Sequence, residues 1–142
     1  MRKGFTLLEL LIVVIVVGIL ATIAIPQFLT SVEKARVAKA KNALGLIAHA
    51  EKMYRAERDT YVGDGSDLPT ALDDYIELKQ VRDDDDDWTY TVTSTVDTFT
   101  ATATKNAGRA HATENIAIDQ DGGCSATHTL AGPDCYNAGE GD

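Results

Sequence analysis

Residues 2–25 read RKGFTLLELLIVVIVVGILATIAI, and this stretch decides the fold class of the chain. Between Phe5 and Ile25 the only charged side chain is Glu9. A helix of about 20 apolar residues is long enough to cross the hydrocarbon core of a bilayer. The stretch therefore predicts one membrane-spanning helix, preceded by the basic residues Arg2 and Lys3.

A cleaved secretory signal is the alternative explanation for an apolar N-terminus. Such signals have a core of about 7–15 apolar residues followed by a small-residue cleavage site. The segment Ala21–Ala24 could serve as that site, but the uncharged run Leu10–Ile25 is longer than such a core. A carboxylate in hydrocarbon is costly unless it is paired, so Glu9 also argues for a special role. The helix dipole relieves part of that cost, and we expect a counter-charge on another molecule to relieve the rest.

The N-terminal pattern resembles the class III signal of type IV prepilins and of the related type II secretion pseudopilins. The resemblance rests on the basic leader, Gly4, Phe5, Glu9 and the apolar run, and it is specific over residues 1–58. It implies that a prepilin peptidase cuts after Gly4 and methylates the new amine of Phe5. It also implies that Glu9 is the glutamate used in filament assembly.

The same resemblance gives the expected partners and location. Cleavage creates a cationic amine at Phe5, and Glu9 of one subunit would meet that amine on a neighbouring copy, which fixes the register of a homopolymer. Further partners are the prepilin peptidase, the inner-membrane assembly machinery and, before assembly, membrane lipid. We expect a single-pass precursor in the bacterial inner membrane and, after assembly, an extracellular filament. Gly18 and Pro26 fall where pilins carry a softening glycine and a kinking proline.

Sequence features disagree about the direction in which the helix is inserted into the membrane. Four basic residues soon after the span outnumber the two before it, so the positive-inside rule alone would keep the C-terminus in the cytoplasm. The peptidase signal and a pair of cysteines favour the opposite orientation. We therefore expect the C-terminus outside the cytoplasm.

The fold class expected for the whole chain is α+β and pilin-like, with a long N-terminal helix packed on a small antiparallel sheet of three or four strands. Alternating residues at 88–95 and 98–104 predict a hairpin with one packed face and one threonine face, and a third strand is expected at Thr113–Ile118. The N-terminal segments expected are a leader at 1–4, a transmembrane and filament-core helix at 5–28 and an amphipathic helix at 29–58. A connecting loop is expected at 59–87, with a short helix at Thr70–Ile76. The sheet is expected at 88–118, followed by a disulfide loop and a C-terminal tail at 119–142.

The amphipathic helix has one small and apolar face. That face is formed by Ala40, Ala43, Leu44, Ile47, Ala50 and Tyr54, which recur at three- and four-residue steps. The basic residues of the helix lie largely off this face. They are either its solvated side or partners for the acidic head of a neighbouring subunit.

Charge is divided unevenly along the chain. Residues 59–142 hold eighteen Asp and Glu against four Lys and Arg, a net charge of −14. Phosphate contacts need clustered basic side chains, so no direct nucleic-acid site is expected in this head.

The two cysteines, Cys124 and Cys135, lie near the C-terminus with ten residues between them. Flanking glycines and a proline favour a disulfide-closed loop in an oxidising compartment, and two reduced thiols are the alternative.

The threonines of the hairpin are either ordinary strand residues or sites of glycan attachment or filament contact.

Five consecutive aspartates at 83–87 have two interpretations. They form either a solvated, mutually repelling loop or a weak calcium site through Asp83, Asp85 and Asp87. The run is not an EF-hand, because Trp88 stands where that motif requires glycine. Calcium is the one cofactor that the sequence leaves open, and no individual residue supports a calcium site.

No catalytic motif is present, so we do not expect an enzyme. His49 falls near the packing face of the helix and is assigned a structural role. Three functions remain: a pilin for adhesion, motility or DNA uptake, a type II secretion pseudopilin, and a membrane-anchored binding module that does not polymerise. An anchored enzyme is a fourth hypothesis, which the missing catalytic motif disfavours. The sequence favours the first.

Overall fold

The structure is a computed structural model of the 142-residue chain. It describes residues 4–83, 85–108, 112–128 and 130, without the side chains of Gln80 and Asp83. The chain forms two compact units, Met1–Ala35 and Arg36–Asp142. Helix α1 (Leu7–Arg58) contributes to both units, which are described separately below.

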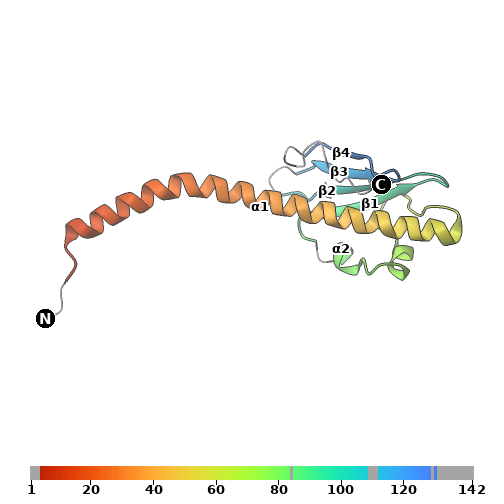
Figure 1. The fold of residues 1–142 in the computed structure, drawn as a ribbon, viewed down its shortest axis with the longest axis horizontal. Coiled ribbons are helices and arrows are strands. Elements are labelled where there is room, and N and C mark those ends of the chain that lie inside the picture. Colours follow the sequence, from red (N-terminus) through yellow and green to blue (C-terminus); the bar gives the residue numbers. More distant parts are fainter. Residues whose placement is uncertain (1–3, 84, 109–111, 129, 131–142) are drawn as a thin grey trace, which may run out of the picture. The chain divides into compact units, whose positions relative to one another are not determined.

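The second unit contains a four-stranded antiparallel sheet in the order β1-β2-β3-β4. The strands are β1 (Trp88–Ser94), β2 (Phe99–Lys105), β3 (Asn115–Asp119) and β4 (Cys124–Ala126). Consecutive strands are neighbours, so the sheet is a simple meander, as Figure 1 shows. The α+β class and the hairpin are confirmed. The third strand begins two residues later than expected, and β4 lies within the stretch assigned to the disulfide loop and tail.

The hairpin forms because its two strands alternate in the same phase. Trp88, Tyr90 and Val92 are buried on β1, and their neighbours on β2 are equally buried. The threonines face the other way and pair across the strands, as in Thr91 opposite Thr102. One face of the sheet therefore belongs to the core, while the other face carries the threonine side chains.

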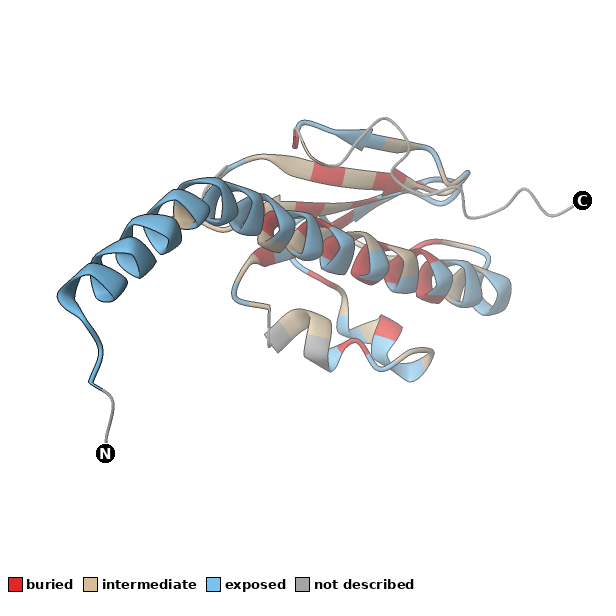
Figure 2. Cartoon of the chain, turned by 60° about the vertical axis from the view of Figure 1, so that its left-hand side comes forward, coloured by how far each residue is buried: buried red, intermediate tan, exposed pale blue. Residues whose placement is uncertain are grey.

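Residues 36–58 of α1 cover the apolar face of the sheet (Figure 2). The helix side of the core consists of small and aliphatic residues. Its buried members are Val37, Ala40, Ala43, Leu44, Ile47, Ala48 and Ala50. They meet the inward-facing residues of the strands, among them Trp88, Phe99 and Ile116. The predicted helix face is thus confirmed, except that Tyr54 is only partly buried.

The connecting segment contains two short helices. The first is the 3₁₀ helix η1 (Thr70–Asp74), where a short helix was expected. The second is α2 (Lys79–Asp83), which lies beside β1 and was not predicted. Leu72 and Leu78 are fully buried and anchor this segment to the core.

Candidate functional site in the first turn and apolar half of helix α1

Thr6 and Glu9 form a reciprocal hydrogen-bonded cap at the start of α1. The backbone N–H and the hydroxyl of Thr6 donate to Glu9 Oε2 at 2.9 and 2.8 Å. The backbone N–H of Glu9 donates to Thr6 Oγ1 at 3.2 Å. This is a capping box, which satisfies two backbone donors that would otherwise lack partners. Sequence reasoning missed it, although Thr6-x-x-Glu9 is the signature of the motif.

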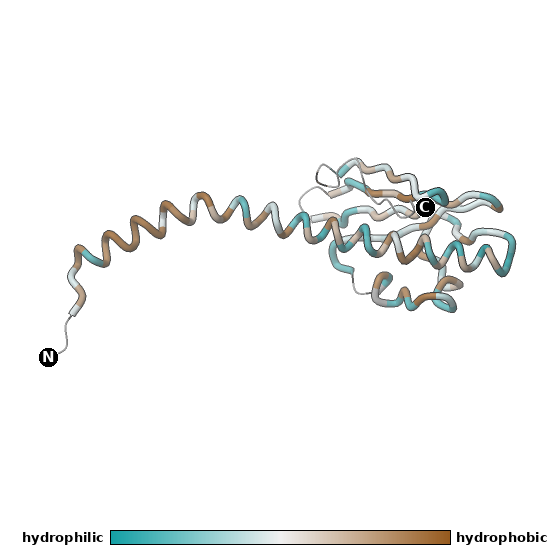
Figure 3. The backbone as a smooth tube through the Cα atoms, viewed as in Figure 1, coloured by the Kyte–Doolittle hydropathy of each residue, from teal (hydrophilic) through white to brown (hydrophobic). Residues whose placement is uncertain are grey.

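The apolar half of α1 exposes its large side chains on all sides. From Phe5 to Leu29 the large apolar residues are 48–89% exposed. In Figure 3 the backbone of this part of the helix is coloured mostly as hydrophobic. Among the described residues, α1 is the one helix long and apolar enough to span a membrane. A helix that is apolar all round needs lipid or other protein around it. This surface and the capped Glu9 together form the candidate functional site.

Gly18 and Pro26 lie within this helix. Nothing approaches within 4 Å of the position where a side chain at Gly18 would begin. Helix α1 continues through Pro26, whose ring nitrogen cannot donate to the carbonyl of Thr22. Separately, the hydroxyl of Thr22 donates to the carbonyl of Ile19 at 2.6 Å. The softening and kinking roles of the two residues stay predictions.

The acidic run before β1 is tied into the second unit by Asp85. Its side chain is 2% exposed and lies 3.2 Å from Lys39 Nζ. Tyr90 Oη donates to Asp85 Oδ2 at 2.6 Å, and the backbone N–H groups of Asp87 and Trp88 donate to Asp85 Oδ1 at 3.1 and 3.2 Å. The buried carboxylate of Asp85 therefore connects α1 to β1 through an ion pair and hydrogen bonds. The expectation of a wholly solvated run is wrong at this position.

The calcium hypothesis finds no support in these contacts. Asp87 Oδ2 lies 3.4 Å from Arg36 Nε, so the protein itself supplies the counter-charges of both Asp85 and Asp87. The side chain of Asp83 lies outside the described residues. Within the described part of the chain, no group of three or more metal-binding side chains gathers.

The basic residues of the helix are not simply its solvated side. Besides Arg36 and Lys39, Arg55 pairs with Asp97 at 3.3 Å and stacks over the Tyr61 ring at 4.8 Å. These cations are therefore used within one chain, an alternative that the sequence did not suggest.

The cysteine pair is only partly visible. Cys124 begins β4 and is partly buried, while Cys135 lies outside the described residues. The disulfide loop stays a prediction.

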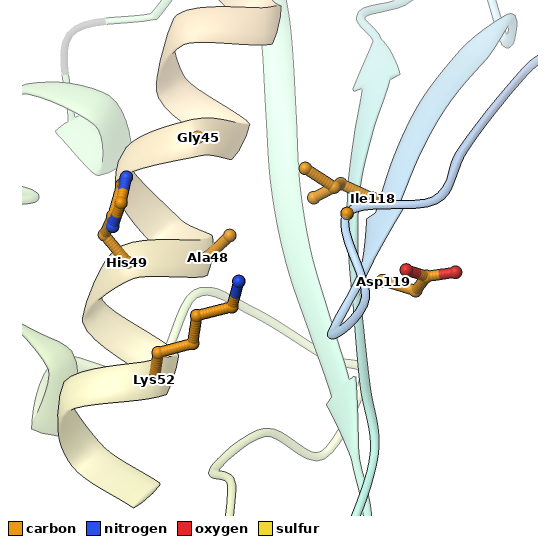
Figure 4. A pocket seen from close by; sticks show the side chains of 7 residues that line it. Gly45, Ala48, His49, Lys52, Ile118 and Asp119 are labelled. Atoms are coloured by element: carbon orange, nitrogen blue, oxygen red, sulfur yellow. The ribbon is translucent and has the colours of Figure 1, made fainter. Parts of the chain in front are cut away.

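A small hollow lies between α1 and the turn that follows β3 (Figure 4). His49 and Lys52 line it from the helix and Asp119 from the sheet. The Asp119 carboxylate accepts from the backbone N–H groups of Asp121 and Gly123 at 3.0 and 2.7 Å. His49 is exposed at the margin of the packing face, between the buried Ala48 and Ala50, and its structural role stays a prediction.

Two family models match this chain. Residues 1–25 match the prokaryotic N-terminal methylation motif. Residues 26–127 match a model described as type IV minor pilin ComP, DNA uptake sequence receptor. The apolar helix with its methylation motif and the helix-on-sheet head define a protein of the type IV pilin class. Because the second match covers more than half of the chain, the chain belongs to the family of the minor pilin ComP.

The individual relatives match less than half of this chain. The type IV major pilin PilA of Myxococcus xanthus is 44% identical over 60 residues, which are 42% of this chain and 27% of the relative. The type II secretion system core protein G of Pseudomonas aeruginosa is 38% identical over 60 residues, or 42% of each chain. The fimbrial protein FimA of Dichelobacter nodosus is 47% identical over 45 residues, which are 32% of this chain and 29% of the relative. The matches thus span less than half of each relative. No solved structure matches the chain.

Proposed function

We propose that this chain is the precursor of a filament subunit that is inserted into the inner membrane, cut between Gly4 and Phe5, methylated on the Phe5 amine and then polymerised through α1. The single observation that carries the proposal is the apolar surface from Phe5 to Leu29, with 48–89% exposure of its large side chains and one acid at its start. In the membrane, lipid covers this surface. In a filament, other copies of the same helix would replace the lipid.

Polymerisation gives Glu9 a second partner. In one molecule its carboxylate is held by Thr6, which neutralises no charge. A methylated amine stays basic, so the Phe5 amine of a neighbouring subunit would carry the counter-charge. Two desolvated charges that meet offset each other's cost and fix the register of the subunits.

Mass spectrometry of filaments sheared from cells tests the proposal. We expect an N-terminal peptide that begins at Phe5 and carries one added methyl group. The Gly4→Arg variant blocks the access of the peptidase to the bond and should accumulate as the longer precursor. A matched Leu8→Ile variant should be processed normally. Filaments that contain subunits starting at Met1, or mature mobility of the Gly4→Arg chain on a gel, would contradict the proposal.

A type II secretion pseudopilin is the second candidate, because core G proteins of that secretion system also match this chain. Both candidates predict the methylated Phe5. They differ in where the filament accumulates, since a surface pilus can be sheared from cells and a short periplasmic filament cannot. Deletion of the chain would then abolish surface filaments in the first case and secretion of exoproteins in the second.

The description of the matching family includes reception of DNA. We do not extend that role to this chain, because residues 59–142 carry eighteen acidic and four basic residues. Such a surface repels phosphates, and DNA binding depends on clustered Lys and Arg. Titration of the detergent-solubilised chain with fluorescent double-stranded DNA should show no binding at 50–200 mM salt, a range in which phosphate-driven binding is strongly salt-dependent. Binding that weakens steeply with salt would reverse this conclusion.

A further inference from the structure

Glu51 is an acid inside the core of the second unit. It lies on α1 one turn after Ile47, and its side chain is 0% exposed. Glu51 Oε2 accepts a hydrogen bond of 3.0 Å from the backbone N–H of Val62. Glu51 Oε1 is buried and has no hydrogen-bond partner among the described residues. A buried carboxylate with a single donor is costly, whereas the neutral acid is tolerated much better.

Val62, which donates to Glu51, belongs to a segment that covers the edge of β1 not paired with β2. The backbone N–H of Gly65 donates to the carbonyl of Val92 at 2.8 Å, and the backbone N–H of Ser94 donates to the carbonyl of Gly63 at 3.2 Å. Asp64 forms an isolated bridge with Thr93 between these two bonds. Residues 62–65 therefore occupy the edge of β1 that β2 does not use. An uncovered strand edge is a template for pairing with another chain.

We infer that Glu51 is a proton-operated latch, which holds residues 62–65 closed over the β1 edge when the carboxyl is neutral and releases them when it ionises. The hydrogen bond from the Val62 N–H connects Glu51 to the segment. The Gly65–Val92 and Ser94–Gly63 hydrogen bonds connect the segment to the sheet. Opening the segment would bring Glu51 Oε1 into water and would leave Val92 and Ser94 without their backbone partners. The inference goes beyond the proposed function and does not require polymerisation.

The direction of the pH effect follows from the burial of the acid. Burial raises the pKa of Glu51 from 4.5 to about 7, and the Val62 N–H lowers it by less. A raised pKa means that the closed form binds the proton more tightly than the open form does. The stabilisation of the closed form is therefore full below about 4.5 and is lost as the pH rises through about 7. From well below pH 4.5 to well above pH 7, the ratio of open to closed segment should increase by about 300-fold in total.

The other titratable groups on the packed elements are engaged elsewhere. On α1, Arg55 donates to Asp97 at 3.1 and 3.3 Å, and its guanidinium lies over the Tyr61 ring of the connecting segment. On the sheet, Tyr90 donates to Asp85, and Lys105 Nζ lies 5.0 Å from the centre of the Trp88 ring. Asp59, at the end of α1, is exposed. The pKa of Glu51 is raised by burial and opposed only by the Val62 amide.

Hydrogen exchange of the full chain in detergent micelles tests the latch. Protection factors of the Gly65 and Ser94 amides, corrected for intrinsic exchange, should fall by up to about 70-fold between pH 5 and pH 8.5. In Glu51→Gln, which keeps an oxygen for the Val62 N–H but cannot ionise, the same protection factors should stay constant. The exposed Glu77→Gln serves as the matched control and should keep the wild-type profile. A constant profile in the wild type, or an equal fall in Glu51→Gln, would overturn the latch.

A second measurement is independent of any variant. Carbon-13 NMR of the Glu51 carboxyl in the wild-type chain should titrate with a midpoint near 7, together with shifts of the Val62 and Gly65 amides. A midpoint near 4.5, or one near 7 that leaves both amides unmoved, would overturn the inference even if Glu51→Gln failed to fold.

Discussion

Tyr90 Oη donates a hydrogen bond of 2.6 Å to Asp85 Oδ2, and this bond ties the middle of β1 to the acidic run in front of it. Burial, this hydrogen bond and the charges of Asp85 and Asp87 all raise the pKa of Tyr90, so its phenol stays a donor at every physiological pH. Lys39 reaches the same carboxylate from α1. One aspartate thus joins the helix to the sheet.

Replacement of Asp85 by alanine should destabilise the second unit. The variant leaves Tyr90 Oη and Lys39 Nζ without their acceptor and frees two backbone donors, and we expect a loss of ~3–5 kcal/mol in the free energy of unfolding. Urea unfolding in detergent, followed by the fluorescence of Trp88, measures this loss, because the chain contains one tryptophan and it is buried in this unit.

Asp86→Ala is the matched control for that experiment. Asp86 is an exposed aspartate of the same run, and the carbonyl that accepts from Asn106 is part of its backbone. Its replacement should change the free energy of unfolding by less than ~0.5 kcal/mol. Equal losses in the two variants would mean that the run acts through its total charge and not through the Asp85 contacts.

The acidic run marks a limit of prediction from the sequence. Five adjacent carboxylates predict repulsion and solvation when only near neighbours along the chain are considered. Arg36 and Lys39 lie far earlier in the sequence, and they meet Asp87 and Asp85 only after the helix has packed on the sheet. The helix and the hairpin were predictable because their periodicities are local. The register between them is not local, so the ion pairs that depend on it were missed.

Glu9 offers a test that separates capping from charge pairing. Glu9→Ala removes the Thr6 contacts and the charge, and we expect a chain that still inserts but yields few filaments. Glu9→Gln keeps an oxygen for the Thr6 N–H and loses only the charge. If the counter-charge on a neighbour drives assembly, both variants fail alike, as immunoblots of the membrane and sheared fractions would show.

The comparison of these two variants is decisive in either direction. Normal filament yield from Glu9→Gln would leave Glu9 with the capping role alone, because a glutamine completes the capping box. Weak membrane insertion of both variants would show instead that Glu9 acts before assembly. Thr6→Ser, which keeps the hydroxyl, should behave as the wild type.

Two of the missed features did have signals in the sequence. Thr6 and Glu9 have the three-residue spacing of a capping box. Glu51 follows Leu44 and Ile47 at helical spacing, so it belongs to the buried face by the same rule that identified its apolar members. A polar residue on such a face is easily passed over, because periodicity is scored on apolar residues alone. Its bond to Val62 depends on the path of the connecting segment and was not predictable.

The packing of α1 on the sheet can be tested with two neighbouring residues. Ile47 is 0% exposed and Leu46 is 43% exposed. Ile47→Ala opens a cavity in the core and should cost ~2–5 kcal/mol in the free energy of unfolding. Leu46→Ala removes a partly exposed side chain and should cost less than ~1 kcal/mol. Urea unfolding monitored at Trp88 compares them, and a larger loss for Leu46→Ala would mean that the helix is rotated on the sheet.

The close approach of the connecting segment to β1 makes a last prediction. A Cβ at Gly63 would overlap the carbonyl oxygen of Val92 and lie 2.8 Å from Val92 Cγ1, so the backbone would have to move. Gly63→Ala should therefore cost ~1–3 kcal/mol and weaken the protection of the Gly65 and Ser94 amides, whose bonds cross the same edge.

Gly45→Ala provides the opposite expectation within the same unit. Nothing lies within 4 Å of a Cβ added at Gly45, which is an interior position of α1. Alanine has the higher helix propensity there, so the variant should gain ~0.5–1 kcal/mol in the free energy of unfolding. Measured side by side, the two glycine variants should shift the unfolding midpoint in opposite directions. If Gly63→Ala instead left the midpoint and the amide protection unchanged, residues 62–65 would not be seated on β1, since no alanine fits there while the Val92 carbonyl stays in place.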